Sequence, residues 1–419
     1  MNKKIYIIVI IISVVTLSII AVFLLQKKQS ANTVQENSGS LFGSTSGSNG
    51  ILSGALDKKT SKATTTITQN NLPVLRKISN LPVAGAVSVI RTGGEGKTAT
   101  STNTYVRYIE KNTGNIYETE VDTGKTIRLS NTTIPGIANS MWSQDGESLV
   151  IRYIDSKENT VESFLARIKS GEQKRGSTEG VFLQNDINTI TPSIGGNKVF
   201  YINSSSGKAD AIITDFDGKN KKYITTLPIN GWVSQYEIKN KRGVVFLTTK
   251  ASGYAYGYMY KLDTVSGALR KVLGGIPGLT TLVNNFGNLV LYSQTGVGNI
   301  SLYSYDINGK SSDFVPFSTL PEKCAWGEYK KSQIIYCGVP KTIDKSLFPD
   351  SWYQGVSSFS DDIWVYDTTT KNFGVLADIN KLASVDIDII KPFLDDTETH
   401  LFFINKKDST LWVLNIKRD

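Results

Sequence analysis

The amino-acid sequence predicts an all-β fold built from repeated units. Short runs of alternating aromatic and β-branched residues end in polar turns at a regular interval, and stretches with helical periodicity are almost absent. The turns begin at Asp122, Lys169, Asp217, Asp263, Asp306, Asp367 and Asn415, so the steps between them are 47, 48, 46, 43, 61 and 48 residues. A period of about 40–50 residues with several short strands per unit is typical of a β-propeller with one four-stranded blade per repeat. Seven repeats predict seven blades.

The N-terminal segment is predicted to be a membrane anchor. Residues 5–25 contain no charge and are flanked by lysine pairs at 3–4 and 27–28. A helix of this length spans a bilayer core of about 30 Å. A cleaved secretory signal is the alternative, but its apolar region would be unusually long and the following residues are a poor cleavage site. We expect residues 1–28 to form a single transmembrane anchor and the remaining domain to lie outside the cytoplasm.

Residues 29–71 are expected to be a linker, because they are rich in Ser, Thr, Gly and Asn and poor in aromatic residues. The propeller should then occupy residues 72–419. In its repeats, second strands are predicted at 105–111, 148–155, 198–204, 243–249, 289–295, 333–339 and 400–406. Third strands are predicted at 115–121, 162–168, 210–216, 256–262, 300–306, 362–367 and 410–416.

The last repeat ends without a fourth strand. Residues 73–90 resemble residues 125–142, which are a predicted fourth strand leading into the next repeat. We therefore expect residues 73–79 to complete the last blade and close the ring, which leaves no sheet edge exposed there.

One repeat carries a motif that resembles a known family. The run WSQDGESLVI at 142–151, followed by a strand and a DTG or FDG turn, is similar to the propeller repeats of the TolB family. The resemblance covers roughly residues 73–419 and is sharpest in the second repeat; Ser193, Gln235 and Asn285 stand where that repeat has Trp142. It implies a propeller fold and an extracytoplasmic role in binding a partner.

The two cysteines predict a disulfide. A hairpin that turns near residues 330–331 places Cys324 and Cys337 opposite one another, at a separation that a disulfide bridges. A bridge indicates an oxidising compartment; two unpaired buried thiols are the alternative. Two cysteines and one histidine cannot supply a zinc site, so no metal is expected.

Composition and motifs argue against an enzyme. The net charge is +9, of which residues 1–28 contribute +4. The charged residues that follow sum to +5 but are scattered and of both signs, so no nucleic-acid partner is expected. His400, the only histidine, begins a predicted core strand and is assigned a structural role, which excludes a Ser-His-Asp arrangement. No phosphate loop or dinucleotide fingerprint is present, so no cofactor is expected.

Carboxylate pairs could hydrolyse glycosides without histidine. Asp361 and Asp362 are neighbours, however, and should point to opposite sides of a strand. Asp386 and Asp388 are equally consistent with solvated loop residues.

Two features are candidate binding sites. The long step comes from an insertion at 338–362 that carries Phe348, Asp350, Trp352 and Tyr353. Aromatic residues on a loop held by a rigid scaffold are a common recognition device; alternatively, Phe348 and Trp352 fold back over the disulfide hairpin.

The second candidate is a run of four alternating tyrosines, Tyr254, Tyr256, Tyr258 and Tyr260. Their period of two places all four rings on one face. The four rings either pack between blades or form an exposed platform that binds glycan.

The sequence thus predicts a membrane-tethered module of the cell envelope that binds or scaffolds a protein or a glycan. The alternatives are a carbohydrate-active hydrolase or lyase with carboxylates at the propeller axis, and a structural cell-surface spacer. Three or more acidic side chains clustered in one axial pocket would favour the enzyme. An aromatic or flat apolar patch on one rim would favour partner binding, and the spacer predicts no pocket.

Overall fold

The computed structural model describes residues 72–93, 101–130, 133–155, 160–168, 178–204, 207–239 and 242–416. The predicted anchor at 1–28 and linker at 29–71 lie outside these residues. Within the described part, no helix is both long enough and apolar enough to cross a membrane.

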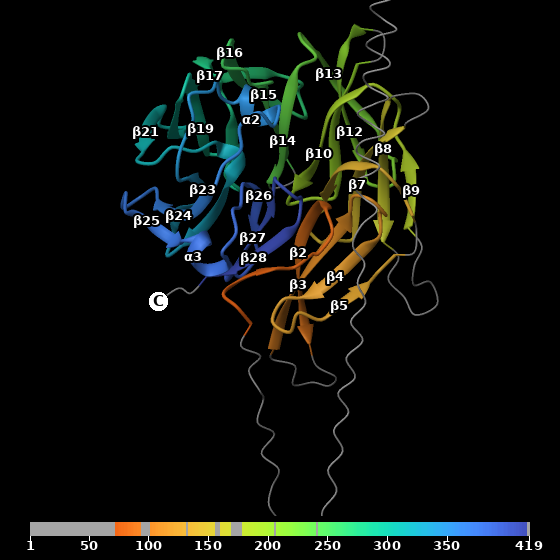
Figure 1. Ribbon diagram of the computed structural model, residues 1–419. Helices are drawn as coiled ribbons and strands as arrows, with labels where there is room; N and C mark the ends of the chain where they lie inside the picture. Colours follow the sequence, from red (N-terminus) through yellow and green to blue (C-terminus); the bar gives the residue numbers. More distant parts are fainter. Residues whose placement is uncertain are drawn as a thin grey trace, which may run out of the picture. The chain divides into compact units, whose positions relative to one another are not determined.

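Regular structure in the described residues is almost entirely β (Figure 1). Five sheets have four strands each. The first three contain β2 (Val83–Gly93), β3 (Ser101–Glu110), β4 (Ile116–Glu120) and β5 (Thr126–Arg128); β6 (Ile137–Trp142), β7 (Ser148–Asp155), β8 (Thr160–Ile168) and β9 (Thr178–Phe182); β18 (Thr281–Val283), β19 (Leu289–Gly296), β20 (Asn299–Asp306) and β21 (Ser311–Val315). The other two contain β22 (Cys324–Tyr329), β23 (Ser332–Pro340), β24 (Asp361–Asp367) and β25 (Phe373–Ala377); β26 (Ile389–Leu394), β27 (His400–Asn405), β28 (Leu411–Asn415) and β1 (Leu75–Lys77).

A sixth sheet has eight strands. It contains β10 (Ile187–Ile194), β11 (Lys198–Asn203), β12 (Ala209–Asp215), β13 (Lys222–Leu227), β14 (Trp232–Lys239), β15 (Arg242–Thr249), β16 (Tyr256–Asp263) and β17 (Leu269–Pro277). These strands form two antiparallel four-stranded units, joined where β10 and β14 pair in parallel over two residues each. The short helical elements are η2 (Pro321–Lys323), α2 (Asp350–Tyr353) and α3 (Ile379–Ala383).

The sheets surround a common axis. One cavity is lined by residues from the first strand of every unit along the chain, namely β2, β6, β10, β14, β18, β22 and β26. Four-stranded antiparallel units whose first strands face one central space are the arrangement of a β-propeller. The predicted strands agree closely with the observed ones; β7 has the predicted bounds, and the repeated turns that fall on described residues, such as those at Asp122 and Asp263, follow the third strand of their unit.

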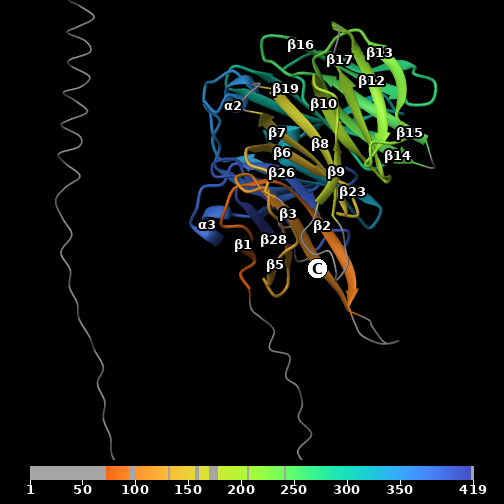
Figure 2. The same cartoon turned by 90° about the vertical axis from the view of Figure 1, so that its right-hand side faces the viewer.

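The two ends of the domain meet, as predicted. Strand β1 pairs with β28 in antiparallel register, with Leu75 opposite Leu414 and Lys77 opposite Trp412, and the two strands lie together in Figure 2. The Leu75 side chain is buried. Residues from the N-terminal segment therefore complete the C-terminal sheet.

The core lies between neighbouring sheets rather than at one centre. Between the first and last sheets, for example, Val83 and Val106 pack with Phe402 and Val413. Inner strands bury both faces against adjacent sheets, so their middle residues are apolar on both sides; all six residues of β27 are buried, whereas the outer strand β5 is exposed throughout. This packing leaves the connecting loops at the two ends of the ring as the variable surface.

Candidate binding surface and axial cavity

The disulfide predicted from the hairpin is present. Cys324 on β22 and Cys337 on β23 stand opposite one another in the strand register and are bonded. The insertion leaves the sheet directly after β23 and returns at β24. Its base is therefore the most strongly cross-linked hairpin among the described residues.

The insertion is held against two neighbouring hairpins. A carboxylate oxygen of Asp350 accepts the backbone N–H of Gly253, between β15 and β16, over 2.7 Å. The N–H of Gly298, between β19 and β20, donates to the Ser346 carbonyl over 2.8 Å. Next to it, Val297 forms a β-bridge with Leu347. The structure thus brings the two sequence-predicted candidates into direct contact.

Two of the predicted recognition residues are not exposed. Phe348 is 0% and Trp352 3% exposed, and they pack with Phe359, Leu320 and Ile300. The expectation that both rings are presented to a partner is therefore corrected. As the alternative expected, both rings fold back, but they pack in a cluster separate from the one that contains Cys324 and Cys337. Their large apolar area is the physical reason, because burying it stabilises the loop by roughly 2–3 kcal/mol per ring.

The exposed residues of these loops form what we call the rim patch. It consists of Tyr254, Tyr256, Val297, Tyr353 and Val356, whose exposed fractions are 88%, 68%, 71%, 47% and 75%. All five lie in or directly beside three loops that contact one another through the insertion. Solvent-exposed aromatic and aliphatic side chains on adjoining loops are typical of interaction surfaces.

The four alternating tyrosines divide between the two expected roles. Tyr254, Tyr256 and Tyr258 are exposed, Tyr258 the least of the three. Tyr260 is half-buried and packs edge-on against Trp232, with ring centroids 5.8 Å apart. Exposure thus decreases along β16 toward the sheet interior, and only the loop end of the strand contributes to the rim patch.

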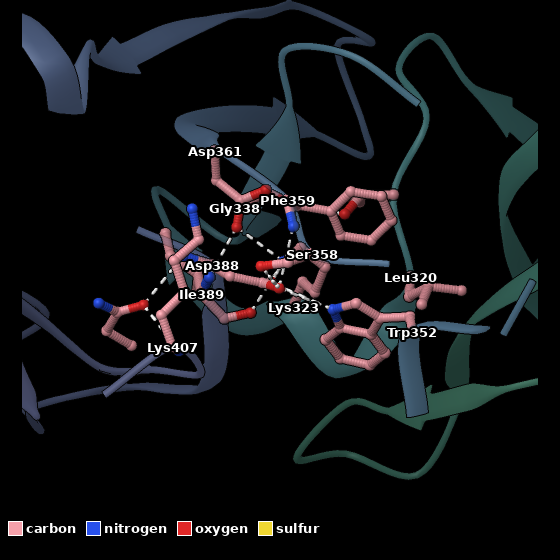
Figure 3. A network of polar contacts seen from close by, with 12 residues as sticks. Leu320, Lys323, Gly338, Trp352, Ser358, Phe359, Asp361, Asp388, Ile389 and Lys407 are labelled. Atoms are coloured by element: carbon pink, nitrogen blue, oxygen red, sulfur yellow. Dashed lines mark hydrogen bonds and ion pairs between the residues drawn. The ribbon is translucent and has the colours of Figure 1, made fainter. Parts of the chain in front are cut away.

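A buried polar cluster lies beneath the insertion (Figure 3). The Lys323 ammonium contacts a carboxylate oxygen of Asp361 at 2.7 Å and one of Asp388 at 2.6 Å. Trp352 donates its indole N–H to Asp388, at 3.2 Å and 3.0 Å from the two oxygens. Burial, opposed by the attraction of Lys323, raises the pKa of Asp361 to about 6. The expectation that Asp388 is a solvated loop residue is wrong, whereas Asp386 is exposed.

The expected separation of Asp361 and Asp362 is confirmed. Asp361 faces Lys323 in the interior, and Asp362 pairs with the more exposed Lys341 at 3.1 Å. The two carboxylates therefore lie on opposite faces of β24 and do not form a glycosidase pair.

The axial cavity has a volume of about 640 Å³ and carries charges of both signs. Its lining includes Lys391 and the carboxylates of Glu237, Asp395, Asp396 and Glu398. Lys391 donates to the Ala84 carbonyl at 3.0 Å. Part of its side chain is exposed, but desolvation of the ammonium inside the cavity, followed by repulsion from Lys111, lowers its pKa to about 8. No group of three or more residues suited to hold a metal ion occurs in the described ranges.

Two of these carboxylates serve local structure. Asp395 accepts the backbone N–H of His400 at 2.7 Å and hydroxyl groups of two threonines, Thr397 and Thr399. Burial by itself would raise the pKa of Asp395, but hydrogen bonds from His400 and Thr397 lower it to about 2. Glu398 accepts the N–H of Glu328 at 2.7 Å. The side chain of His400 is buried against Asp395, in agreement with its predicted structural role.

Comparisons with known proteins leave the function open. No family model matches the chain, and no curated protein matches it. Among solved structures, Kuenenia stuttgartiensis hydrazine synthase is similar with 16% identity and a TM-score of 0.48, over 68% of this chain and 78% of that one. An oligogalacturonate lyase in complex with manganese has 11% identity and a TM-score of 0.40, over 75% and 74%. The Cps50 (Swd1) β-propeller domain of Myceliophteria thermophila has 8% identity and a TM-score of 0.47, over 82% and 100%. Likeness at this level says nothing about activity.

Sequence reasoning missed Lys323, Val297 and Val356. Lys323 stands 65 residues from Asp388 in the chain, and nothing in its local sequence sets it apart from the other basic residues. The valines lie in loops whose contact with the insertion depends on the ring arrangement of the sheets. The unusual 61-residue step was the only signal, and it indicated the correct loop.

Proposed function

We propose that this protein is a membrane-tethered, seven-bladed, TolB-like propeller that binds a protein partner of the cell envelope through the rim patch. The observation that carries the proposal is the exposure of five apolar or aromatic side chains on the insertion and on the two loops that contact it. Seven units of four strands, counting the two in the eight-stranded sheet, support the blade number. The uncharged segment at 5–25 and the disulfide support an anchored domain outside the cytoplasm.

The composition of the rim patch favours a protein over a glycan. Tyrosine is enriched among the residues that dominate protein–protein binding energies, because its ring buries a large area at low entropic cost. A glycan platform would use ring faces edged by hydrogen-bonding groups, whereas Val297 and Val356 offer only aliphatic surface. Desolvating these valines requires an apolar counterpart, which a protein side chain supplies.

The patch is also held in place before a partner arrives. Buried Phe348 and Trp352 secure the insertion from below, and Asp350 ties it to the loop that carries Tyr254. Loops fixed in one conformation lose little entropy on binding, so more of the contact energy appears as affinity.

The test is photo-crosslinking in intact cells with a photoreactive residue at position 254, followed by identification of the captured protein. We expect one dominant protein partner, whose capture through the same position falls when Tyr256→Ala is added; truncating a hot-spot tyrosine typically weakens binding by about 30-fold. Tyr223→Ala is the matched control, because Tyr223 is also exposed but lies on β13, away from the patch. Equal capture in Tyr256→Ala and Tyr223→Ala, or capture of carbohydrate alone, would contradict the proposal.

A carbohydrate-active hydrolase or lyase is the second candidate. It is favoured by the axial cavity, where four carboxylates and Lys391 line one space, although two of the carboxylates are engaged in turns. An assay of acidic polysaccharide cleavage, with the release of new chain ends as the readout, tests this candidate. If the protein is such an enzyme, Lys391→Met should abolish cleavage and Tyr254→Ala should leave it intact. Cleavage that is unchanged in Lys391→Met would contradict this candidate.

A further inference from the structure

The cluster beneath the insertion places an amine directly against two carboxyl groups with no access to solvent. The side chains of Lys323, Asp361 and Asp388 are all 0–2% exposed. They come from three places in the chain: η2, the first residue of β24, and the residue before β26 (Figure 3). An amine and a carboxyl group held in contact in this way have the composition of an amide bond plus one water.

The cluster lies among aromatic rings and buried acids. The rings of Trp352 and Phe359 lie 5.2 Å and 5.1 Å from the Lys323 nitrogen, and the Lys406 ammonium also lies over the Trp352 ring. The carboxyl group of Glu322, next to Lys323 in the chain, is buried as well. Two carboxylates face one ammonium in a low-dielectric space, so a proton on one carboxyl relieves the excess negative charge. The raised pKa of Asp361, about 6, brings the neutral form of this carboxyl within reach near neutral pH.

The hydrogen bonds assign different roles to the two acids. Asp388 is held by the Trp352 indole, the Phe359 N–H at 3.0 Å and the Ser358 hydroxyl at 3.3 Å, which suit a carboxylate. Asp361 accepts only the Ile389 N–H, at 2.6 Å, besides Lys323, through Oδ2; its Oδ1 has no hydrogen-bond partner in the described part of the chain. The Ile389 N–H is thus placed to stabilise negative charge that develops on Oδ2.

We propose that Lys323 and Asp361 form an intramolecular isopeptide bond, with Asp388 as the general base. Asp388 takes a proton from the Lys323 ammonium, and the free amine attacks Cγ of the neutral Asp361 carboxyl. The C–N bond forms and the bond from Cγ to Oδ1 breaks. The hydroxyl leaves as water with a second proton that comes directly from the nitrogen, and Asp388 keeps the first proton and ends neutral. The condensation requires no oxidant or cofactor.

The bond would reinforce the hairpin that carries the insertion. It would link the residue before β22 to β24, whereas the disulfide at Cys324 and Cys337 links β22 to β23. Together the two bonds would connect three consecutive strands at the base of the loop. The proposal is independent of what the rim patch binds.

The test is mass spectrometry of the full-length protein after denaturation and reduction, which opens the disulfide. We expect a mass lower than that of the sequence by one water, resistance of the chain to trypsin after Lys323, and a branched peptide that joins Lys323 to Asp361. Asp388→Asn and Lys323→Met should restore the full mass, with circular dichroism to verify that each variant retains its sheets.

Lys341 and Asp362 supply the matched control. They form a similarly close pair, at 3.1 Å, but at the surface, so Asp362→Ala should leave the loss of water unchanged. Wild-type protein with the full mass and normal cleavage after Lys323 would overturn the proposal and leave a buried ion cluster. A bond to Asp388, or a bond that forms in Asp388→Asn, would overturn the assigned roles.

Discussion

The strand exchange that closes the ring offers a quantitative test of the fold. Removing residues 73–80 from the full-length protein deletes β1 and exposes β28. The buried Leu75 side chain contributes about 2–3 kcal/mol. Hydrogen bonds from Ile78 N–H to the Leu411 carbonyl, from Asn415 N–H to the Val74 carbonyl and from Leu411 N–H to Ser79 Oγ contribute about 1 kcal/mol each. We expect a loss of about 6 kcal/mol, a large part of the 5–15 kcal/mol typical of a domain.

Urea unfolding of the full-length protein in detergent, monitored by tryptophan fluorescence, measures this loss of unfolding free energy. A single substitution refines it: Leu75→Ala should cost about 3 kcal/mol because it leaves a cavity in the last sheet. Val74→Ala is the matched control, because its side chain is partly exposed and should change stability by less than about 0.5 kcal/mol. Deletion of residues 30–60 should likewise leave the midpoint unchanged. A deletion of 73–80 whose midpoint equals that of the wild type would refute the closure argument.

Three further predictions concern single features. Replacing Cys324 and Cys337 by serine should lower the free energy of unfolding by about 3 kcal/mol, because the bridge closes a short loop with a sequence separation of 13; unchanged urea midpoints in the double variant would contradict this. The folded-state pKa of Asp395, about 2, lies below its ordinary value of 3.8. Its contribution is therefore complete above the unfolded pKa and is lost as the pH falls toward 2, about 2.5 kcal/mol in all; Asp395→Asn should flatten this part of a stability–pH profile, and an unaltered profile would count against it. Gly278→Ala should cost more than about 3 kcal/mol, because its Cβ would lie 1.6 Å from a threonine hydroxyl oxygen. Gly275→Ala, with a similar positive φ but nothing within 4 Å, should cost only about 1 kcal/mol in the same thermal melts, and equal losses would show that backbone strain alone acts.

Much of the fold could be predicted because its determinants are local. The short apolar, β-branched run at 148–155, bounded by a turn, specifies a strand buried on both faces, and β7 has these bounds. The pairing of Cys324 with Cys337 depends on a hairpin only 13 residues across. Closure by 73–79 was also predictable, because one internal repeat retained the pattern that the last repeat lacks.

The candidate site was predicted only in part, because side-chain exposure depends on distant neighbours. Trp352 and Tyr353 are adjacent in the chain, yet Trp352 is buried against Asp388 whereas Tyr353 is 47% exposed. No local pattern distinguishes them. Asp388 is similar: its loop composition suggests solvent, whereas Lys323 of η2, 65 residues away in the chain, pairs with it in the interior.

Periodicity and short-range spacing were sufficient to predict the repeat, the strands within each unit, the disulfide and the position of the irregular loop. Which aromatic rings face solvent, that the loop around Tyr254 joins the insertion at Asp350, and that one lysine lies between two carboxyl groups depend on how the sheets pack. Gly253 and Asp350 are 97 residues apart and meet only because successive sheets turn around one axis. Contacts of that kind arise from the packing of whole units, which no single stretch of the chain encodes.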